Sequence, residues 1–336
     1  MSGDRCPRLV DVAVHLPETG MDTESVEDRI AALNPELEVP RGLLGRFTGV
    51  RYRHVQPAGS WGIDLGVRAA QTLLARNEIR AEDLDLVIFA AASTDVLEPA
   101  AAHVVAAELG ASCPVFDVHN ACNSLLNAIE VADALIRAGA YRTVLVVCGE
   151  TLSRAARWRF DTVDEYIASG ASHSLSDGGA ALLLEGADEP GILAHRACAN
   201  SDAWRSVLLP LNWTESAEPT AGALQVRTVD LYRAVATLDH DLPAKVLAEL
   251  GLTVDDVAVF CVHQPADAYL KDFCERSGIP LERTINTIRD HGNLSAATLP
   301  LQLTLAADSG RLRRGDIAVL IGLASGVSLG ILVLRW

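Results

Sequence analysis

The sequence predicts an α/β protein built from two similar halves. Short apolar runs typical of buried strands alternate with segments of helical periodicity, such as Ser124–Ala138 and Thr298–Ser309. The runs are Leu84–Ala92, Thr143–Cys148, Ala180–Leu184, Val257–Val262 and Ile317–Gly322. Strands that alternate with helices of this length indicate parallel sheets covered by helices on both faces.

Size and composition agree with a large packed core and exclude several classes of function. The chain has 336 residues, of which 49 % are hydrophobic, so it can form two domain-sized units or one fused body. Its net charge of −16, without a long run of either sign, argues against nucleic-acid binding and against docking on anionic lipid. Seven cysteines without a CxxC pair indicate reduced thiols in a cytoplasm, and Met1–Arg8 lacks the apolar core of a signal peptide.

The uncharged segment Ile317–Leu334 approaches the length of a membrane span, which needs about 20 residues. It is interrupted by five small residues, which are Gly322, Ser325, Gly326, Ser328 and Gly330. We therefore expect two buried strands joined by a Ser-Gly turn and no membrane span.

The chain also repeats a pattern. Glu82–Phe89 and Asp255–Val262 each lead from an acidic turn into a strand, and each is followed later by a helix that ends in Gly. Alignment of Gly139 with Gly310 places Cys122 opposite Asn293. A duplicated unit with its halves face to face would bring both residues to matching helix starts, although chance similarity between two α/β segments is the alternative.

These patterns divide the chain into three parts. Residues 1–185 form an N-terminal half that carries Cys122, and residues 226–336 form a C-terminal half that carries His263 and Asn293. The less regular stretch 186–225, which is rich in Pro and Gly, is interpreted as a connection.

Cys122 stands between a strand that ends near Val118 and a helix that begins around Asn120–Asn123. A thiol at a helix start feels the positive end of the helix dipole, which favours thiolate. The free N–H groups there can also bind an oxyanion formed during attack on a thioester. The alternative is an inert core cysteine. For His119, three residues before the cysteine, two roles are open, which are lining the site and packing or helix entry, and we expect the second.

His263 follows a predicted strand, at the carboxyl end where open α/β sheets bind ligands, although a structural role is equally compatible with that position. Asn293 follows Gly292 and can cap the next helix, which does not exclude a second role.

Together, the segments around Cys122, His263-Gln264-Pro265 and His291–Ala297 resemble the three active-site motifs of the β-ketoacyl-acyl-carrier-protein synthase III enzymes of the thiolase superfamily. Thr48–Arg51, Ser176–Ala180 and the closing Ser325–Trp336 resemble that family too, and the likeness runs from about residue 10 to the C-terminus.

This resemblance implies the five-layered αβαβα thiolase fold and a homodimer. It further implies that Cys122 carries an acyl group as a thioester, while His263 and Asn293 stabilise the enolate of a second substrate and His263 exchanges protons. Backbone N–H groups of Cys122 and near Ser325–Gly326 would form the oxyanion hole. The substrates would be acyl-CoA or acyl thioesters on a carrier protein. We expect no bound metal or redox cofactor, since no cluster has metal-ligand spacing and no phosphate loop occurs.

Two departures from the family pattern refine the expectation. Leu43 and Phe47 stand where fatty-acid initiation enzymes have a Trp and an Arg that clamp coenzyme A, so the acyl donor is bound differently or arrives on a carrier protein. Glu98, in Leu97-Glu98-Pro99, looks like the branch that joins two acyl thioesters head to head, which includes olefin-pathway thiolases and pyrone-forming ketosynthases. There a glutamate from the partner subunit acts as a base. An ordinary exposed Glu before a Pro is the alternative.

Three functions remain open at this point. The leading hypothesis is a ping-pong Claisen condensation in secondary lipid or polyketide metabolism. The others are acyl transfer to an oxygen or nitrogen acceptor and a non-catalytic partner subunit. The intact set of Cys122, His263 and Asn293 favours catalysis, and Asn293 favours condensation because simple acyl transfer forms no enolate.

Overall fold

The computed structural model describes residues 6–213 and 219–336, so most of the predicted polar N-terminus, residues 1–5, lies outside the described residues. The strands are β1 Cys6–His15, β2 Gly20–Asp22, β3 Tyr52–His54, β4 Leu86–Ala90, β5 Val115–Val118, β6 Thr143–Thr151, β7 Asp177–Ala187, β8 Ile192–Ala199, β9 Val207–Leu208, β10 Leu211–Trp213, β11 Pro219–Ala221, β12 Gln225–Val226, β13 Val257–Val262, β14 Ile317–Ala324 and β15 Ser328–Arg335.

The α-helices are α1 Thr23–Leu33, α2 Leu43–Thr48, α3 Gly62–Arg76, α4 Ala101–Leu109, α5 Ser124–Arg137, α6 Val163–Ser169, α7 Thr228–Ala236, α8 Leu242–Glu249, α9 Asp267–Ser277, α10 Ile288–His291 and α11 Thr298–Asp308. Short 3₁₀ helices are η1 Ala81–Asp83, η2 Leu152–Ala155, η3 Gly170–Ser174, η4 Ser201–Ser206, η5 Val254–Asp256, η6 Leu281–Arg283 and η7 Ser295–Ala297.

Two sheets form the body of the protein, and both are mixed. The first has the order β1-β7-β6-β4-β5, and the second has the order β13-β14-β15-β8. β4 runs parallel to β5 and β6, and β13 runs parallel to β14, whereas the remaining pairs are antiparallel. The prediction of parallel sheets is therefore wrong. A parallel pair needs a crossover of about a dozen residues, and the short turn between β14 and β15 cannot supply one.

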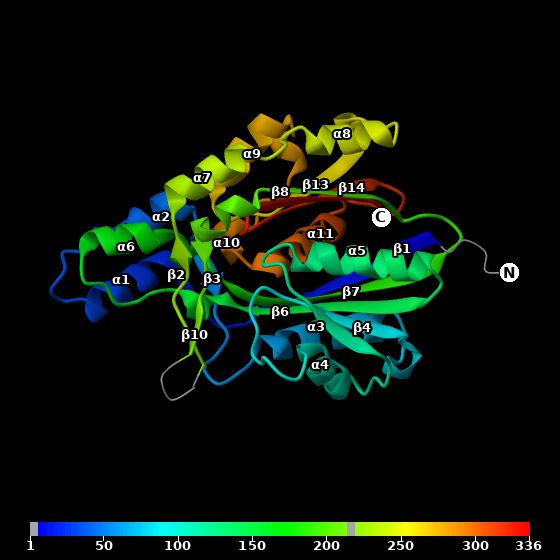
Figure 1. Cartoon of the computed structure of the whole chain (residues 1–336), viewed down its shortest axis with the longest axis horizontal. Helices are drawn as coiled ribbons and strands as arrows, with labels where there is room; N and C mark the ends of the chain where they lie inside the picture. Colours follow the sequence, from blue (N-terminus) through cyan, green and yellow to red (C-terminus); the bar gives the residue numbers. More distant parts are fainter. Residues whose placement is uncertain (1–5, 214–218) are drawn as a thin grey trace.

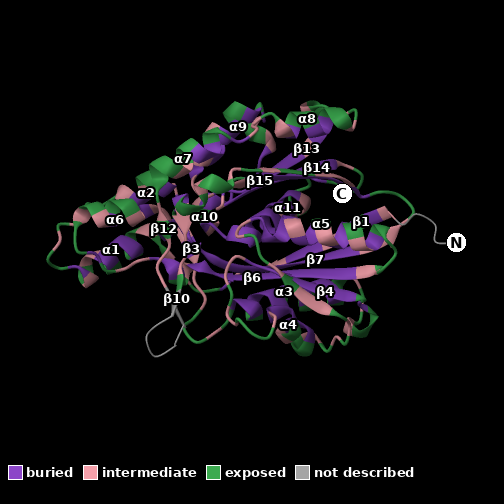
Figure 2. Ribbon diagram, in the orientation of Figure 1, coloured by how far each residue is buried: buried purple, intermediate pink, exposed green. Residues whose placement is uncertain are grey.

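The elements stack in five layers, which confirms the predicted αβαβα arrangement (Figure 1). α3 and α4 cover the outer face of the first sheet, α5 and α11 lie between the two sheets, and α8 and α9 cover the second sheet from outside. Figure 2 shows that the strands are mostly buried, whereas the outer helices alternate between buried and exposed residues. This pattern is expected for helices with one face on a sheet.

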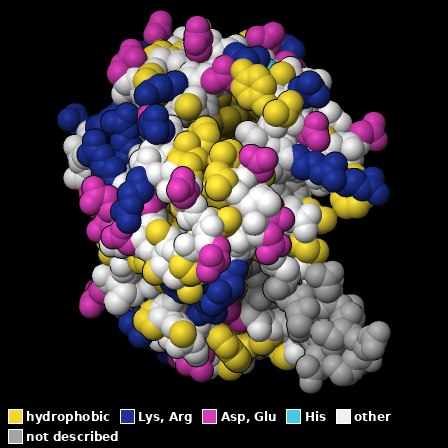
Figure 3. Space-filling view, turned by 90° about the vertical axis from the view of Figure 1, so that its left-hand side faces the viewer, with side chains coloured by type: hydrophobic (Ala, Val, Ile, Leu, Met, Phe, Trp, Pro, Cys, Tyr) yellow, Lys and Arg dark blue, Asp and Glu magenta, His cyan; other side chains and the backbone are white. Residues whose placement is uncertain are grey.

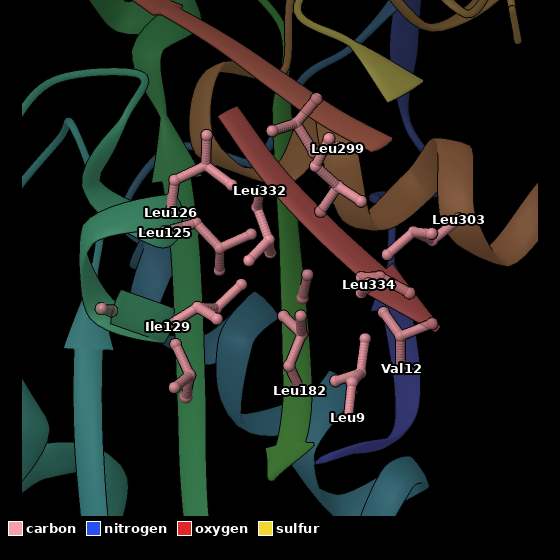
Figure 4. Packing of buried hydrophobic residues seen from close by; sticks show 14 of the residues in the cluster. Leu9, Val12, Leu125, Leu126, Ile129, Leu182, Leu299, Leu303, Leu332 and Leu334 are labelled. Atoms are coloured by element: carbon pink, nitrogen blue, oxygen red, sulfur yellow. The ribbon is translucent and has the colours of Figure 1, made fainter. Parts of the chain in front are cut away.

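The largest core fills the space between the two sheets (Figure 4). Leucines and isoleucines of α5 and α11 pack there against β1, β7 and β15. Members of this core are Leu9, Val12, Leu125, Leu126, Ile129, Leu182, Leu299, Leu303, Leu332 and Leu334. Burial of such side chains contributes about 1.5–3 kcal/mol each, so this layer holds the two sheets together.

The two halves share one topology. In order and direction, β1-β7-β6-β4 matches β8-β15-β14-β13. Gly139 and Gly310, the aligned glycines, have φ values of 71° and 72° just after α5 and α11. Ala121 and Gly292, which immediately precede Cys122 and Asn293, also both have positive φ, at 46° and 68°. The structure thus supports duplication over chance similarity.

The segment 186–225 is more than a connection, because β8 within it is the edge strand of the second sheet. Its charged and polar residues, His195 and Arg196 among them, hide the apolar pattern of a strand. Residues 214–218 of the segment lie outside the described residues. The division at 185 and 226 itself stays an interpretation of the sequence.

The predicted strand pair near the C-terminus is confirmed. β14 and β15 form an antiparallel hairpin in which Ala324 pairs with Ser328. Within the residues that the structure describes, no helix is both long enough and apolar enough to cross a membrane.

Helix α3 lies unusually close to the first sheet because glycines face each other across the contact. A Cβ atom added to Gly179 of β7 would lie 2.2 Å from the carbonyl carbon of Leu65 and 2.4 Å from the amide nitrogen of Gly66. Real Cβ atoms do not approach backbone so closely, so a side chain at position 179 must push α3 away from the sheet.

We expect Gly179→Ala to lower the free energy of unfolding by about 1–3 kcal/mol or more, because the added methyl group overpacks this contact. Urea unfolding followed by circular dichroism measures the effect. Gly45→Ala in α2 is the matched control, since the nearest atom to its added Cβ is 3.9 Å away. An equal loss of stability in both variants would contradict the close packing of α3.

Candidate active site

One cavity of about 840 Å³ brings together the three residues that the motifs predict. Cys122, His263 and Asn293 all line it, although Cys122 comes from the N-terminal half and the other two from the C-terminal half. Leucines and valines between Val207 and Leu231 form much of the remaining wall. Figure 3, which faces the end of the molecule that carries α1, α2 and α6, shows hydrophobic side chains gathered around a hollow.

Cys122 is held between β5 and α5 by contacts that reach the opposite half. Asn123, the next residue, donates from Nδ2 to the hydroxyl oxygen of Ser328 at 3.0 Å and to its carbonyl oxygen at 3.3 Å. The hydroxyl of Ser295 donates to Cys122 Sγ at 3.3 Å. The start of α5 is therefore fixed against β15 and η7, and the sulfur receives a hydrogen bond from the other half.

The pKa of the Cys122 thiol is raised to about 11, mainly by burial and to a smaller extent by the nearby Glu150, while the Ser295 hydrogen bond opposes this rise. The expectation that the helix start favours thiolate is therefore wrong for the protein without substrate. Sequence position shows the helix dipole, but it does not show that the sulfur is desolvated beside a carboxyl group.

His263 stands at the end of β13, as predicted, and its backbone N–H donates to Ile321 of β14 at 2.8 Å. The side chain is only 3 % exposed, and its Nδ1 has no hydrogen-bond partner among the described residues. Burial lowers the pKa of His263 to about 4. The imidazole is therefore neutral at pH 7 and can donate one hydrogen bond while it accepts another.

Gln264, next to the histidine, ties this strand end to the loop before α10. Its Oε1 accepts from the backbone N–H groups of Thr287 at 2.9 Å and Ile288 at 3.0 Å. Its Nε2 donates to the carbonyl oxygen of Ile285 at 2.7 Å. Gln264 is part of the His263-Gln264-Pro265 motif, and in the structure its side chain fixes the strand end to this loop.

Asn293 is held in place by hydrogen bonds of its backbone and of its side-chain amide oxygen. Its N–H donates to Ser174 at 2.7 Å, and its carbonyl oxygen accepts from Ser176 at 3.0 Å. Its Oδ1 accepts from the N–H of Ser295 at 3.0 Å, at the start of η7. Among the described residues no partner takes up the Nδ2 group, so this donor is available to a ligand in the cavity that Asn293 lines.

Gly292 makes this close approach possible. A Cβ atom at position 292 would lie 2.8 Å from Ser176 Cβ and 2.9 Å from the carbonyl oxygen of Ser174, and φ is 68°. Glycine alone meets both requirements at no steric cost.

Glu150, at the end of β6, is a site residue that sequence analysis missed. It is fully buried, and its carboxyl group accepts from the N–H groups of Ala92 at 2.8 Å, Ser93 at 2.9 Å and Ala296 at 3.3 Å. Burial raises its pKa to about 7. The available signal was an acidic residue two positions after the apolar run Thr143–Cys148, where a charge is rarely buried without partners.

Of the other residues considered in the sequence, some line the cavity of Cys122 and others do not. Ser325, in the turn between β14 and β15, lines the cavity, and Gly326 follows it in that turn. His119 also lines the cavity, with its Nδ1 at 3.0 Å from the carbonyl oxygen of Ala91, in contrast to the expected packing role. Glu98 is exposed and does not line the cavity of its own chain, whereas the neighbouring Leu97 does.

The two residues at the coenzyme A clamp positions lie on α2. Leu43 is half-buried against the small core formed by α1, α2 and α6, and Phe47 is 52 % exposed. Neither lines the cavity of Cys122.

Comparison with known proteins agrees with this geometry. The sequence matches the family models of 3-oxoacyl-[acyl-carrier-protein] synthase III over residues 116–201 and of its C-terminal part over residues 247–336. The β-ketoacyl-[acyl-carrier-protein] synthase III of Sphingopyxis alaskensis is 32 % identical over 322 residues, which are 95 % of this chain and 96 % of that protein. That of Paracoccus denitrificans is 32 % identical over 327 residues, covering 96 % of this chain and 97 % of that protein.

Solved structures show the same fold. The synthase III FabH from Pseudomonas aeruginosa PAO1 has a TM-score of 0.84 and 26 % identity, with 99 % of this chain and 98 % of that chain covered. A structure of OleA from Xanthomonas campestris has a TM-score of 0.88 and 23 % identity, with 99 % of each chain covered. The chain therefore belongs to the β-ketoacyl-[acyl-carrier-protein] synthase III family of the thiolase superfamily, and it is a condensing enzyme of the transferase class.

Proposed function

We propose that this enzyme joins two acyl thioesters by a ping-pong Claisen condensation through an acyl-Cys122 intermediate. The observation that carries the proposal is the apolar cavity on which Cys122, His263 and Asn293 converge. A nucleophile and two neutral donors around one cavity suit both the acyl transfer and the later enolate chemistry.

In the first step, Cys122 Sγ attacks the carbonyl carbon of an acyl thioester. The new C–S bond forms as the bond to the leaving thiolate breaks, and the cysteine proton passes to that leaving group, with His263 as the neutral carrier. Backbone N–H groups of Cys122 and of the Ser325–Gly326 turn would bind the transient oxyanion. Because burial keeps the pKa of the thiol high, this proton must leave during attack rather than before it.

In the second step, the second acyl thioester loses a proton from the carbon next to its carbonyl group. The resulting enolate oxygen would accept hydrogen bonds from His263 and from Asn293 Nδ2. The enolate carbon then attacks the acyl carbon on Cys122, so that the C–C bond forms as the C–S bond breaks. The departing Cys122 thiolate would regain a proton through His263, which balances the proton that the base removes from the second substrate. Glu98 from a second copy of the chain would take the proton.

A homodimer would allow Glu98 of one subunit to act as a base in the cavity of the other subunit. β5 is the outermost strand of the first sheet, and its residues Val115, Phe116 and Val118 are half-buried apolar side chains. An unpaired edge of this kind favours pairing with another strand. The exposed Glu98 belongs to a loop whose neighbouring residues Val96 and Leu97 line the cavity, so the same loop of a partner would lie beside the joined edges.

The cavity suits acyl chains delivered as acyl-CoA or on an acyl carrier protein, because its wall between Val207 and Leu231 is largely aliphatic. Leu43 and Phe47 occupy the positions of the coenzyme A clamp, so the acyl donor would be bound differently from that of the fatty-acid initiation enzymes. A role in secondary lipid or polyketide metabolism is consistent with both features.

Incubation with a panel of acyl thioesters should add one acyl mass to the wild-type protein and none to Cys122→Ala, because Sγ is the nucleophile. Intact-protein mass spectrometry measures the adduct, and Cys113→Ala, at a half-buried cysteine that does not line the cavity, is the control. If no thioester labels Cys122, the non-catalytic subunit becomes the better hypothesis. An ester or amide product without a β-keto product would favour acyl transfer instead.

Glu98→Ala should keep the acylation of Cys122 and lose at least about tenfold in condensation rate, since removal of a general base costs about 10²–10⁴-fold in typical enzymes. Glu108→Ala, at an exposed acid on α4, should leave both steps unchanged. Product analysis by mass spectrometry separates the two steps. Full condensation by Glu98→Ala would rule out its role as a base.

Alkylation of Cys122 by iodoacetamide should accelerate about tenfold per pH unit from pH 7 to 10, because the thiolate fraction rises tenfold per unit below the thiol pKa of about 11. Ser295→Ala should slow the reaction at every pH, since the lost hydrogen bond stabilises the thiolate. Peptide mass spectrometry follows the modified cysteine. A plateau between pH 7 and 8 would contradict the raised pKa.

A further inference from the structure

A second cavity, of about 480 Å³, lies beside the acyl cavity and is lined by a different set of residues. Its wall comes from β2, β3, α1 and the 3₁₀ helices η2 and η3 with their neighbours. Of its described lining residues, only Arg154 and Leu175 line both cavities. No Asp or Glu is among these described residues, whereas Arg29, Arg53, Arg154 and His173 are. In a chain with a net charge of −16, this concentration of basic groups is a local exception.

Arg53 is buried and forms no direct salt bridge with the described residues, although the nearby carboxylates of Asp22 and Glu27 stabilise its charge. It is 4 % exposed, and its Nη2 donates to the hydroxyl of Thr23 at 2.9 Å. Its Nη1 reaches the carbonyl oxygen of Asp22 at 3.5 Å, and Nε has no partner in the described part of the chain. The carboxylate of Asp22 is occupied by the N–H of Ser25 at 2.6 Å. Burial lowers the pKa of Arg53 to about 10, so it is still charged at neutral pH.

Burial of such a group is costly, because a guanidinium group without a directly paired counterion has lost the stabilisation that water gives it. Proteins keep buried charges where an ion or ligand pairs with them. Arg53 faces a cavity with room for such a partner.

The neighbouring groups extend the same site. Arg29 stacks its guanidinium group 4.0 Å above the ring of Trp158. His173 is 2 % exposed, its two ring nitrogens have no partner within residues 6–213 and 219–336, and its ring packs edge-on against Trp158 with centroids 5.4 Å apart. Arg154 is already engaged by Asp95 at 3.8 Å and by the carbonyl oxygen of Pro57 at 3.3 Å. Among the described lining residues, Arg29 and Arg53 are therefore the cations left for a ligand.

We propose that this cavity binds a small organic anion, with a carboxylate or phosphate group at Arg29 and Arg53 and a flat apolar body beside Trp158. A guanidinium group presents paired N–H donors that match either oxyanion. The volume is within the range of small-molecule sites, about 300–1,000 Å³. The apolar lining residues Met21, Val26 and Val55 suit the body of such a ligand.

The site stands directly behind Asn293. Ser172, His173 and Leu175 line the cavity, and Ser174 and Ser176 of the same segment hold the backbone of Asn293. Among the described lining residues, the site shares only Arg154 and Leu175 with the acyl cavity, and Cys122, His263 and Asn293 do not line it, so anion binding can be measured without turnover.

Isothermal titration calorimetry with phenyl phosphate, benzoate and neutral benzyl alcohol, at constant ionic strength in chloride, tests the proposal. We expect saturable binding of at least one of the two anions and none of the alcohol. Comparison of the dissociation constants of phenyl phosphate and benzoate shows which anionic group the site prefers. Absence of saturable binding for both anions would overturn the proposal.

Arg29→Gln should weaken anion binding at least tenfold, and Arg46→Gln, at an exposed arginine on α2 outside the cavity, should leave it unchanged. Arg53→Gln should weaken binding in the same way, with circular dichroism to confirm that the variant folds. If Arg53→Gln does not fold, the anion affinity of Arg29→Gln alone tests the proposal. Binding that is as tight in Arg29→Gln as in the wild type belongs to the acyl cavity and would also overturn the proposal.

Discussion

The buried carboxyl group of Glu150 is the contact on which the geometry of the active site depends. It holds the loop after β4 through Ala92 and Ser93, and it holds η7 of the other half through Ala296. Ser295, next to Ala296, carries the hydroxyl that donates to Cys122 Sγ. Loss of the carboxyl group would leave three backbone N–H groups without their acceptor, and each buried orphan costs about 1–3 kcal/mol. One side chain thus links both halves to the nucleophile.

The duplicated architecture explains why the proposed catalytic residues come from different halves. In each half, a residue with positive φ turns the chain ahead of the central helix, three residues before α5 in one half and three residues before η7, which precedes α11, in the other. The next residue lies close to the other half. In one half that residue is Cys122, and in the other it is Asn293. Because α5 and α11 share the layer between the sheets, their starts meet over one cavity. At these two positions the halves have diverged in the chemical group that they present.

Much of this arrangement could be predicted from the sequence. The strand Val257–Val262 agrees with β13, and Ser124–Ala138 agrees with α5 to within a residue, because long apolar or amphipathic segments report burial directly. Strand direction could not be predicted in this way, since a buried strand has the same pattern in parallel and antiparallel sheets. β8 was missed because the polar residues His195 and Arg196 interrupt its apolar pattern and only Ile192 is buried. The identity of the site residues could be predicted from the sequence, but their protonation states could not. The protonation of Cys122 and His263 depends on burial that only the folded chain creates.

The same burial that keeps the thiol protonated also makes the cavity suitable for acyl chains. A preformed thiolate and imidazolium pair would need water or fixed charges around it, and these would oppose the binding of a hydrocarbon chain. With Cys122, His263 and Asn293 all neutral, the wall can remain apolar up to the reacting atoms. In the mechanism that we propose, negative charge arises only during attack, first on the acyl oxygen and later on the enolate oxygen, where fixed N–H donors would stabilise it without reorganisation. The raised pKa of Cys122 and the aliphatic cavity wall are thus two consequences of one desolvated site.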